Sequence, residues 1–206
     1  MKITKDSRRL VLAMAFSDGY LNASGYMSVR HCVSQKEYLE WKKHLLNKHG
    51  IHTTDIYYVT NNGYGAYEFR TIHYDFIKVL RRRLYKPSKK KAQISILKNF
   101  TPLHLAIWYM DDGSLSQRKR NGKIISNELF LNTYISYEDN QIIQDYFANR
   151  WNIQFTINKS KSSYRLRCGT HMARCFVEII RPYVEQVPCM LYKIDVKPDL
   201  SKAISE

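Results

Sequence analysis

The 206-residue chain lacks the features that mark zinc-binding, disulfide-rich or membrane-embedded proteins. Its four cysteines form no CxxC pair and share no zinc-like spacing with histidine, so we expect free thiols in a reducing compartment and no structural zinc. No apolar run approaches the ~18 residues of a membrane-spanning helix. The N-terminal Met-Lys-Ile-Thr-Lys-Asp has no signal-peptide core. These absences predict an intracellular protein without a membrane partner.

Acidic residues are also scarce. The chain has 18 of them against 33 Lys and Arg, which gives a formal net charge of +15. So large an excess favours a polyanionic partner over a neutral one, although a merely basic soluble protein is the plain alternative. The 16 tyrosines suit wet, polar interfaces.

Two segments 94 positions apart look like the same short helix ending in the same acid: Val11-Leu-Ala-Met-Ala-Phe-Ser-Asp18-Gly19 and Leu105-Ala-Ile-Trp-Tyr-Met-Asp-Asp112-Gly113. Glycine after the last turn predicts a left-handed helix terminator. A carboxylate at the negative end of a helix dipole is disfavoured by ~0.3–1 kcal/mol. Because the chain makes this choice twice, we expect a cation beside each aspartate.

The repetition continues along the chain. Ser34 and Ser136 each follow a strand-like alternation and precede acidic residues with a helical period, which predicts a strand running into an N-capped helix. We interpret the chain as two copies of one α+β unit of about 90–100 residues, a common domain size. The expected boundaries are 1–86 for the first repeat, 87–100 for a basic linker and 101–206 for the second repeat.

The local patterns predict the elements of each repeat. The first repeat should hold helices near 8–17, 35–49 and 73–84 and strands near 26–33, 53–60 and 65–71, with a turn from 19 to 25. In the second repeat Thr101 caps a helix that begins at Pro102. The order then repeats, with a long basic loop at 116–123 before the next strand.

The expected strands are apolar on one face and polar on the other. Val29 and His31, for example, alternate with Ser28 and Arg30. The apolar face should pack on helices, and the polar face should display side chains able to read base edges in a major groove. A solvated sheet face is the plain alternative for any single strand. The expected DNA-binding residues are Ser28, Arg30, Arg70, Arg118, Lys119, Arg120, Lys123, Asn132, Gln154, Thr156, Asn158, Lys159, Lys161, Arg165 and Arg167.

The paired segments ending Phe-Ser-Asp18-Gly19 and Met-Asp-Asp112-Gly113 resemble the two motifs of single-chain LAGLIDADG homing endonucleases. The second motif, from Thr101 to Gly113, looks like the form of the intron-encoded branch. The first departs from the family pattern, with Phe16 at the usual first acid. The terminal acid is present in both motifs, and the resemblance extends from residue 8 to about 195.

The resemblance implies an α+β fold of two pseudo-symmetric repeats. Each should run helix, two strands, helix, two strands, helix, and the antiparallel sheets should form a DNA-binding saddle. The two motif helices should pack at the pseudo-twofold axis and bring Asp18 and Asp112 together. The implied partner is double-stranded DNA with a long specific target site, bound by a monomer.

The family chemistry implies hydrolysis of both DNA strands with a divalent metal, leaving short 3′ overhangs. Mg²⁺ (or Mn²⁺) prefers the oxygen ligands that Asp18 and Asp112 offer, and Ser17 and Asp111 are the neighbouring candidates. The family pattern also places a basic residue at each scissile phosphate, by position Lys89 and Lys193. For Lys89 the alternative is a tri-lysine linker that only touches phosphate.

Two other functions use the same scaffold. One is an RNA maturase that assists intron splicing, and the other is a catalytically silent DNA-binding regulator in which Phe16 would be a first sign of decay. Retention of both acids favours the nuclease. The expected location is wherever the target DNA lies, in a phage or bacterial cytoplasm or an organelle. An intein origin is less expected, because a methionine stands just before the first motif and no splicing-domain flanks are seen.

Overall fold

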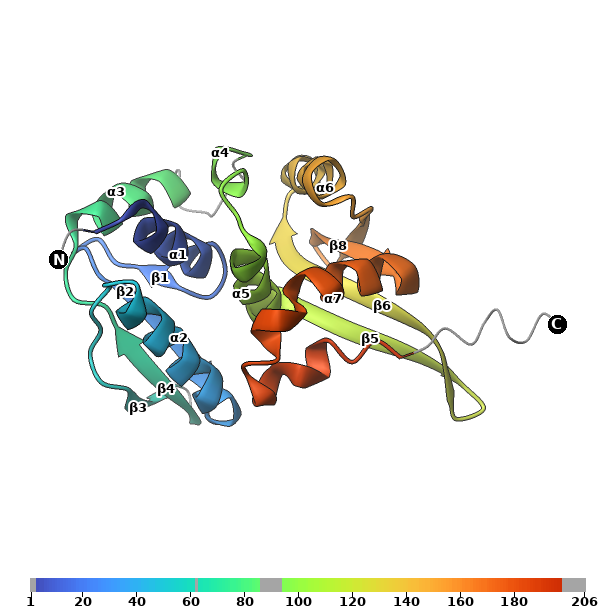
Figure 1. Ribbon diagram of the computed structural model, residues 1–206, viewed down its shortest axis with the longest axis horizontal. Helices are drawn as coiled ribbons and strands as arrows, with labels where there is room; N and C mark the ends of the chain where they lie inside the picture. The colour runs from blue at the N-terminus through green and yellow to red at the C-terminus, as the bar shows by residue number, and fades with distance from the viewer. Residues whose placement is uncertain (1–2, 62, 86–93, 198–206) are drawn as a thin grey trace. The chain divides into compact units, whose positions relative to one another are not determined.

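The computed structural model describes residues 3–61, 63–85 and 94–197. Lys89 and half of the expected linker, residues 87–93, lie outside these residues. The chain divides into two compact units, Met1–Lys91 with Val187–Met190 and Ala92–Gln186 with Leu191–Glu206. Each unit holds one four-stranded antiparallel sheet and several helices (Figure 1).

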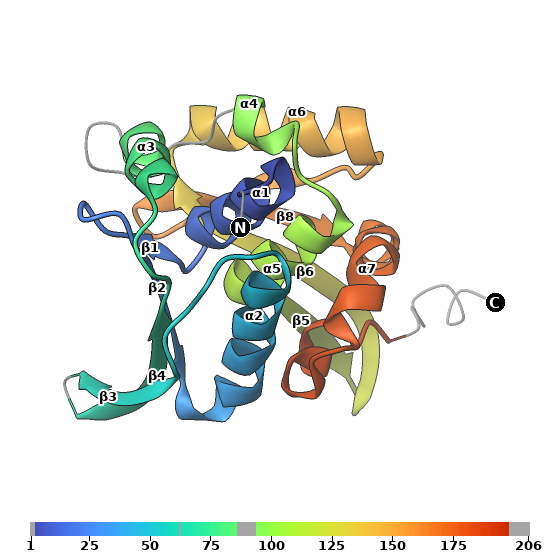
Figure 2. The same ribbon diagram turned by 60° about the vertical axis from the view of Figure 1, so that its left-hand side comes forward.

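The first unit has its strands in the order β1-β2-β4-β3. The helix α2 lies along this sheet (Figure 2). Its buried side chains, Tyr38, Leu39, Lys42 and Leu46, recur at helical spacing. The elements are α1 (Lys5–Phe16), β1 (Tyr20–Leu21), β2 (Met27–Cys32), η1 (Val33–Gln35), α2 (Lys36–Lys48), β3 (Tyr57–Asn61), β4 (Tyr64–Arg70) and α3 (Asp75–Leu84).

The second unit repeats this order, with the strands arranged β5-β6-β8-β7. A short helix, α4 (Ile94–Leu97), lies within the residues expected as linker. The other elements are α5 (Pro102–Asp112), β5 (Gly113–Arg120), β6 (Lys123–Ile135), α6 (Tyr137–Trp151), β7 (Thr156–Ser160), β8 (Ser163–Gly169), α7 (Thr170–Val184) and η2 (Pro188–Lys193), the last of which contributes residues to both units.

Helix starts follow the expected caps in the second unit. Thr101 is the N-cap of α5 with Pro102 at the first helical position, and the Ser136 hydroxyl accepts the backbone N–H of Asp139 at 3.1 Å. The expected cap at Ser34 is wrong. The chain makes the 3-10 turn η1 there, which moves the start of α2 to Lys36 and its N-cap to Gln35.

The alternation predicted for the strands is confirmed on β2 but not on β6, where the consecutive residues Leu129, Phe130 and Leu131 are all buried. On β2, Met27, Val29 and His31 are buried, whereas Arg30 and Cys32 are exposed. The strand β2 lies against α2, as the apolar period of its buried face predicts. Val33, the last residue of the strand expected near 26–33, is half-exposed because it leaves the strand for η1.

The basic loop expected at 116–123 is wrong. This segment forms a regular hairpin of β5 and β6, which projects from the rest of its unit (Figure 1). The turn is Asn121-Gly122, and both residues have the positive φ that a type I′ turn requires. The Asn-Gly dipeptide was the available signal, and the basic composition of the segment obscured it.

Local patterns also missed β1 as a strand and placed a turn there. It has only two residues, so its pairing with β2 rather than its own period defines it. With β1 and β5 included, both units follow the expected order of helix, two strands, helix, two strands, helix. Within the described residues, no helix is long and apolar enough to cross a membrane.

Candidate active site and nucleic-acid interface

The first motif helix ends in a tight turn that exposes Asp18. The backbone N–H of Gly19 donates to the Met14 carbonyl at 2.7 Å, and the buried Ser17 hydroxyl lies 3.3 Å from the same carbonyl. The Asp18 side chain remains 44% exposed. Ser17, an expected metal ligand, therefore directs its hydroxyl at its own helix.

The expected left-handed terminators are wrong for both motif glycines. Gly113 is extended, with φ −83° and ψ 153°, and Gly19 has no positive φ. Glycine is needed for close approach instead. A Cβ at Gly19 would lie 2.7 Å from the Met14 carbonyl oxygen, and one at Gly113 would overlap the Tyr109 ring and carbonyl. The absence of a side chain lets the chain turn tightly next to each acid.

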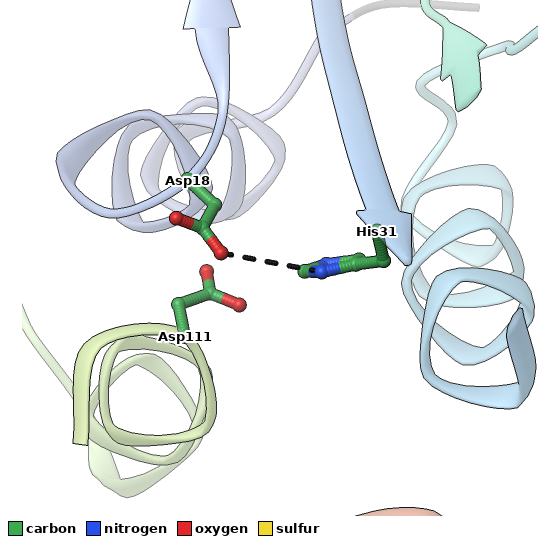
Figure 3. A group of neighbouring side chains, drawn as sticks. All are labelled: Asp18, His31 and Asp111. Atoms are coloured by element: carbon green, nitrogen blue, oxygen red, sulfur yellow. Dashed lines mark ion pairs between the residues drawn. The ribbon is translucent and has the colours of Figure 1, made fainter. Parts of the chain in front are cut away.

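The Asp18 carboxylate points toward His31 on β2 (Figure 3). Oδ2 of Asp18 lies 4.0 Å from Nδ1 of His31, whose side chain is only 4% exposed. The other ring nitrogen, Nε2, lies 3.0 Å from Nζ of Lys42, and Lys42 is fully buried. The three residues form a continuous polar chain from the surface into the first unit.

The Lys42 ammonium determines how His31 can act. An ammonium can only donate, so Nε2 of His31 accepts and the proton of a neutral ring lies on Nδ1, facing Asp18. Lys42 also lies 4.4 Å from the centre of the Tyr38 ring, and His31 packs against that ring at 4.8 Å. His31 therefore presents a positioned N–H to the carboxylate.

Sequence reasoning missed both residues. The strand period predicts His31 only as part of the apolar face, and Lys42 is not among the predicted site residues. The signal was the spacing of α2, because Lys42 stands four residues after Tyr38 and four before Leu46, both buried. A lysine on the buried face of α2 needs a polar partner, and His31 is one.

The second motif helix carries Asp111 and Asp112 in its last turn, and both are half-exposed. Lys193 lies beneath this turn and is only 6% exposed. Its Nζ donates to the carbonyl oxygens of Met110 at 2.5 Å and Gly113 at 2.9 Å. The ammonium thus satisfies carbonyls that a helix end leaves unpaired and offsets the negative end of the dipole.

Each unit therefore places a buried lysine at the acid-bearing end of its motif helix, through His31 in the first unit and through backbone carbonyls in the second. The cation expected beside each aspartate stays a prediction. Asp111, also labelled in Figure 3, projects from the last turn of α5.

The donor set fits a hard divalent cation. With its proton on Nδ1, His31 offers no lone pair toward Asp18, so each unit offers carboxylate oxygens only: those of Asp18 in the first unit, and those of Asp111 and Asp112 in the second. Oxygen-only donors suit Mg²⁺ or Mn²⁺ rather than zinc.

The polar face of the first sheet carries Arg30 and Arg70, both expected to bind DNA. Their side chains are 45% and 47% exposed, and both bond to Glu68, which is buried between them. Burial alone would raise the pKa of Glu68, but hydrogen bonds from Tyr57, Arg30 and Arg70 hold it below its ordinary value. Burial and the Glu68 carboxylate raise the pKa of Tyr57 to about 12.

The polar face of the second sheet brings together several expected DNA-binding residues. Nη2 of Arg167 donates to Glu128 at 2.5 Å, and this bond holds the pKa of Glu128 below its ordinary value. Nη1 of Arg165 donates to Asn132 at 3.3 Å, and its guanidinium lies 4.0 Å from the Phe130 ring centre.

The remaining expected DNA-binding residues lie outside these two clusters. Ser28 pairs with Arg70 in the first sheet, and Thr156 pairs with Arg167 in the second. Asn158 pairs with Arg165 on β7 and β8, and its side-chain oxygen lies 3.5 Å from Nε of that arginine. The others are exposed on the β5–β6 hairpin or near β7: Arg118, Lys119, Arg120, Lys123, Gln154, Lys159 and Lys161.

A family profile covers most of the chain, from residue 11 to residue 176. The chain belongs to the LAGLIDADG DNA endonuclease family. Among solved structures, the homing endonuclease I-WcaI bound to its DNA recognition sequence has the same fold. Its TM-score is 0.78 at 19% identity, over 96% of this chain and 89% of that one.

Two curated relatives differ in what their names describe. The protein RecA of Mycobacterium gastri is 29% identical over 203 residues, which cover 90% of this chain and 46% of that protein. The cytochrome b mRNA maturase bI2 of Saccharomyces cerevisiae is 30% identical over 136 residues, covering 62% of this chain and 30% of that one. The chain thus spans less than half the length of either relative.

Proposed function

We propose that this LAGLIDADG protein is a site-specific DNA endonuclease that hydrolyses one phosphodiester in each strand and leaves short 3′ overhangs. One observation carries the proposal. Two units of the same topology each place carboxylates at the end of the motif helix, with a buried lysine behind them. If the acids served only folding, a buried lysine behind the acid-bearing end of the motif helix would not be needed in both units.

Asp18 in the first unit, and Asp112 with Asp111 in the second, are the proposed carboxylate ligands of divalent metal, Mg²⁺ or Mn²⁺. The cation would supply charge stabilisation and an activated water. Lys193 keeps the Asp112 turn in place through the carbonyls of Met110 and Gly113. His31 orients Asp18, and Lys42 fixes the tautomer of His31.

The two sheets would bind DNA through their polar faces, and the exposed β5–β6 hairpin would extend the contact along the duplex. Each repeat supplies one of the two terminal acids, so one copy of the chain is sufficient for the proposed cleavage. We therefore propose a monomer of the single-chain, two-motif class, encoded within an intron, acting on a long target.

The decisive experiment is cleavage of a randomised double-stranded DNA library with Mg²⁺. We expect cuts at one long site with 3′ overhangs. Asp18→Asn or Asp112→Asn alone should abolish double-strand cleavage and leave binding largely intact, because each removes one metal ligand without changing shape. Full cleavage by either variant would contradict the shared role of the two acids.

A second function has a specific observation in its favour, the similarity to a cytochrome b mRNA maturase. An RNA maturase would bind structured intron RNA and promote its splicing, alone or in addition to DNA cleavage. Binding to duplex DNA without cutting would instead favour a regulator. Splicing assistance that survives Asp18→Asn would identify the maturase role.

A further inference from the structure

A buried carboxylate lies at the centre of the polar face of the first sheet. Glu68 on β4 is 2% exposed and accepts four hydrogen bonds. Arg30 donates to Oε2 through Nε at 2.9 Å and Nη2 at 2.6 Å. Oε1 accepts Nε of Arg70 at 2.8 Å and the Tyr57 hydroxyl at 2.5 Å.

The register of the sheet produces this cluster. Arg30 on β2 and Tyr57 on β3 are the two cross-strand partners of Glu68, and Arg70 stands two residues along the same strand. All four side chains therefore point to one face. The helix α2 covers the opposite face, where His31 meets Lys42.

An acid here opposes the function of a surface that binds a polyanion. Glu68 cancels one of the two arginine charges and repels phosphate. Stability alone does not explain the presence of Glu68, because a buried ion pair often stabilises a protein no more than hydrophobic residues in its place. What the carboxylate does provide is a fixed orientation for both guanidinium groups.

The fixed orientation leaves the outer ends of both arginines available. Among the described residues, Nη1 of Arg30 and both terminal nitrogens of Arg70 have no hydrogen-bond partner. The Arg70 guanidinium also lies 5.5 Å from the Tyr26 ring centre and 5.8 Å from that of Tyr57, which restricts its rotation. These planar forks are rigid and half-exposed.

A rigid guanidinium fork matches the O6 and N7 acceptors of guanine in a major groove. We propose that Glu68 is a specificity-determining positioning residue, which holds Arg30 and Arg70 so that the first sheet reads guanine. This rests on the proposed DNA-binding function. A phosphate contact would need charge alone, and Glu68 reduces that charge.

The test is selection of binding sites from randomised duplex DNA by the full chain in Ca²⁺, which supports binding without requiring cleavage. The wild type should select guanine at one or more positions. Glu68→Gln should weaken that preference about 5- to 150-fold, the usual value of a bidentate arginine–guanine pair. Its affinity for non-specific duplex should be equal or higher, because a negative charge is removed.

Two further variants keep the proposal falsifiable if Glu68→Gln folds poorly. Arg30→Lys keeps the charge but not the fork, so it should lose guanine selection while non-specific affinity stays within a few-fold. Glu40→Gln removes the same charge from α2, which covers the other face, and should select the wild-type site.

The outcomes separate the two proposals. A wild-type chain that selects no sequence overturns the proposed function and this inference together. A wild type that selects guanine, with unchanged selection in both Glu68→Gln and Arg30→Lys, overturns this inference alone. Loss of non-specific affinity in Arg30→Lys without loss of selection would assign these arginines to phosphate.

Discussion

At the scale of single residues, the chain places lysine where lysine is rarely found. Lys42 and Lys193 are both buried, and each bonds to a group at or behind the acid-bearing end of a motif helix. A buried ammonium costs desolvation energy, so its retention points to a role other than stability. The two lysines act differently, one through an imidazole and one through backbone carbonyls.

Lys42→Met should separate function from folding. Methionine fills the same space without a buried charge, so we expect the free energy of unfolding to fall little or to rise. His31 would lose the donor that fixes its tautomer, and the proposed double-strand cleavage should drop about 10- to 100-fold. Nicked plasmid should accumulate.

The matched control is Lys43→Met, the neighbouring lysine, which lies 3.0 Å from Asp55 near the surface. That variant should linearise plasmid at the wild-type rate. Equal rates of double-strand cleavage by Lys42→Met and wild type would remove the Asp18–His31–Lys42 chain from the mechanism.

Cysteine reactivity should follow burial. Burial raises the pKa of the Cys168 thiol to about 12, whereas Cys32 is exposed on β2. Only the thiolate reacts, so a thiol reagent at pH 8 should label Cys32 in the folded protein and spare Cys168 until denaturant is added. Mass spectrometry of the labelled peptides measures this, and early labelling of Cys168 would contradict the packing of β8.

At the scale of elements, the two motif helices end through close packing and not through left-handed glycine. Gly113→Ala would drive a Cβ into the Tyr109 ring and carbonyl. We expect a loss of about 1–3 kcal/mol in unfolding free energy, as for other overpacked sites. Thermal or urea unfolding measures it.

Gly169→Ala is the control, because a Cβ there has open space within 4 Å and the backbone has φ −83°. Its stability should change by less than about 1 kcal/mol. Equal stability of the two alanine variants would contradict this expectation. It would show that the residues around Gly113 can move to accommodate a Cβ at little cost in free energy.

The Glu68 cluster makes the first sheet sensitive to acid. Its bonds lower the pKa of Glu68 below the ordinary 4.5, so the ionised form is favoured by the folded state. This contribution is complete above about pH 4.5 and is lost as the pH falls through the folded-state value. The stability difference between wild type and Glu68→Gln should be about 1–3 kcal/mol at pH 7 and shrink below pH 4.5.

Unfolding by urea at several pH values measures this difference. Glu40 is exposed on α2, so the stability difference between wild type and Glu40→Gln should not change with pH in this way. A gap between wild type and Glu68→Gln that persists unchanged at pH 3 would mean that the glutamate contributes through packing and not through its charge.

At the scale of the whole molecule, the net charge of +15 should make DNA binding strongly dependent on salt. Arg118, Lys119 and Arg120 are exposed on the β5–β6 hairpin. Changing all three to glutamine should lower the slope of log K against log salt by ~0.9 for each lost phosphate contact. Fluorescence anisotropy with labelled duplex measures the slope.

The comparison variant changes Lys36, Lys43 and Lys48 of α2 to glutamine, which removes the same charge from the helix covering the opposite face of the first sheet. Its slope should stay near the wild-type value. Equal slopes for the two triple variants would show that net charge alone governs binding and that the hairpin has no special contact.

The sequence by itself determined the repeat, the two terminal acids and the alternation of β2 and β8, because these are periodic and local. The periodicity of a helix or a strand depends on residues close together in the sequence, and so do the N-caps at Thr101 and Ser136. The β5–β6 hairpin is equally local, because its Asn-Gly turn is a short-range signal.

Only the tertiary structure decided which polar residues support those acids and which face the solvent. His31 meets Lys42 because α2 packs on β2, and Glu68 meets Arg30 because β2 pairs with β4 in one register. Such pairs depend on residues 11 and 38 positions apart. Burial then decides their energetics, since a carboxylate or ammonium removed from water must find a partner that no local pattern records.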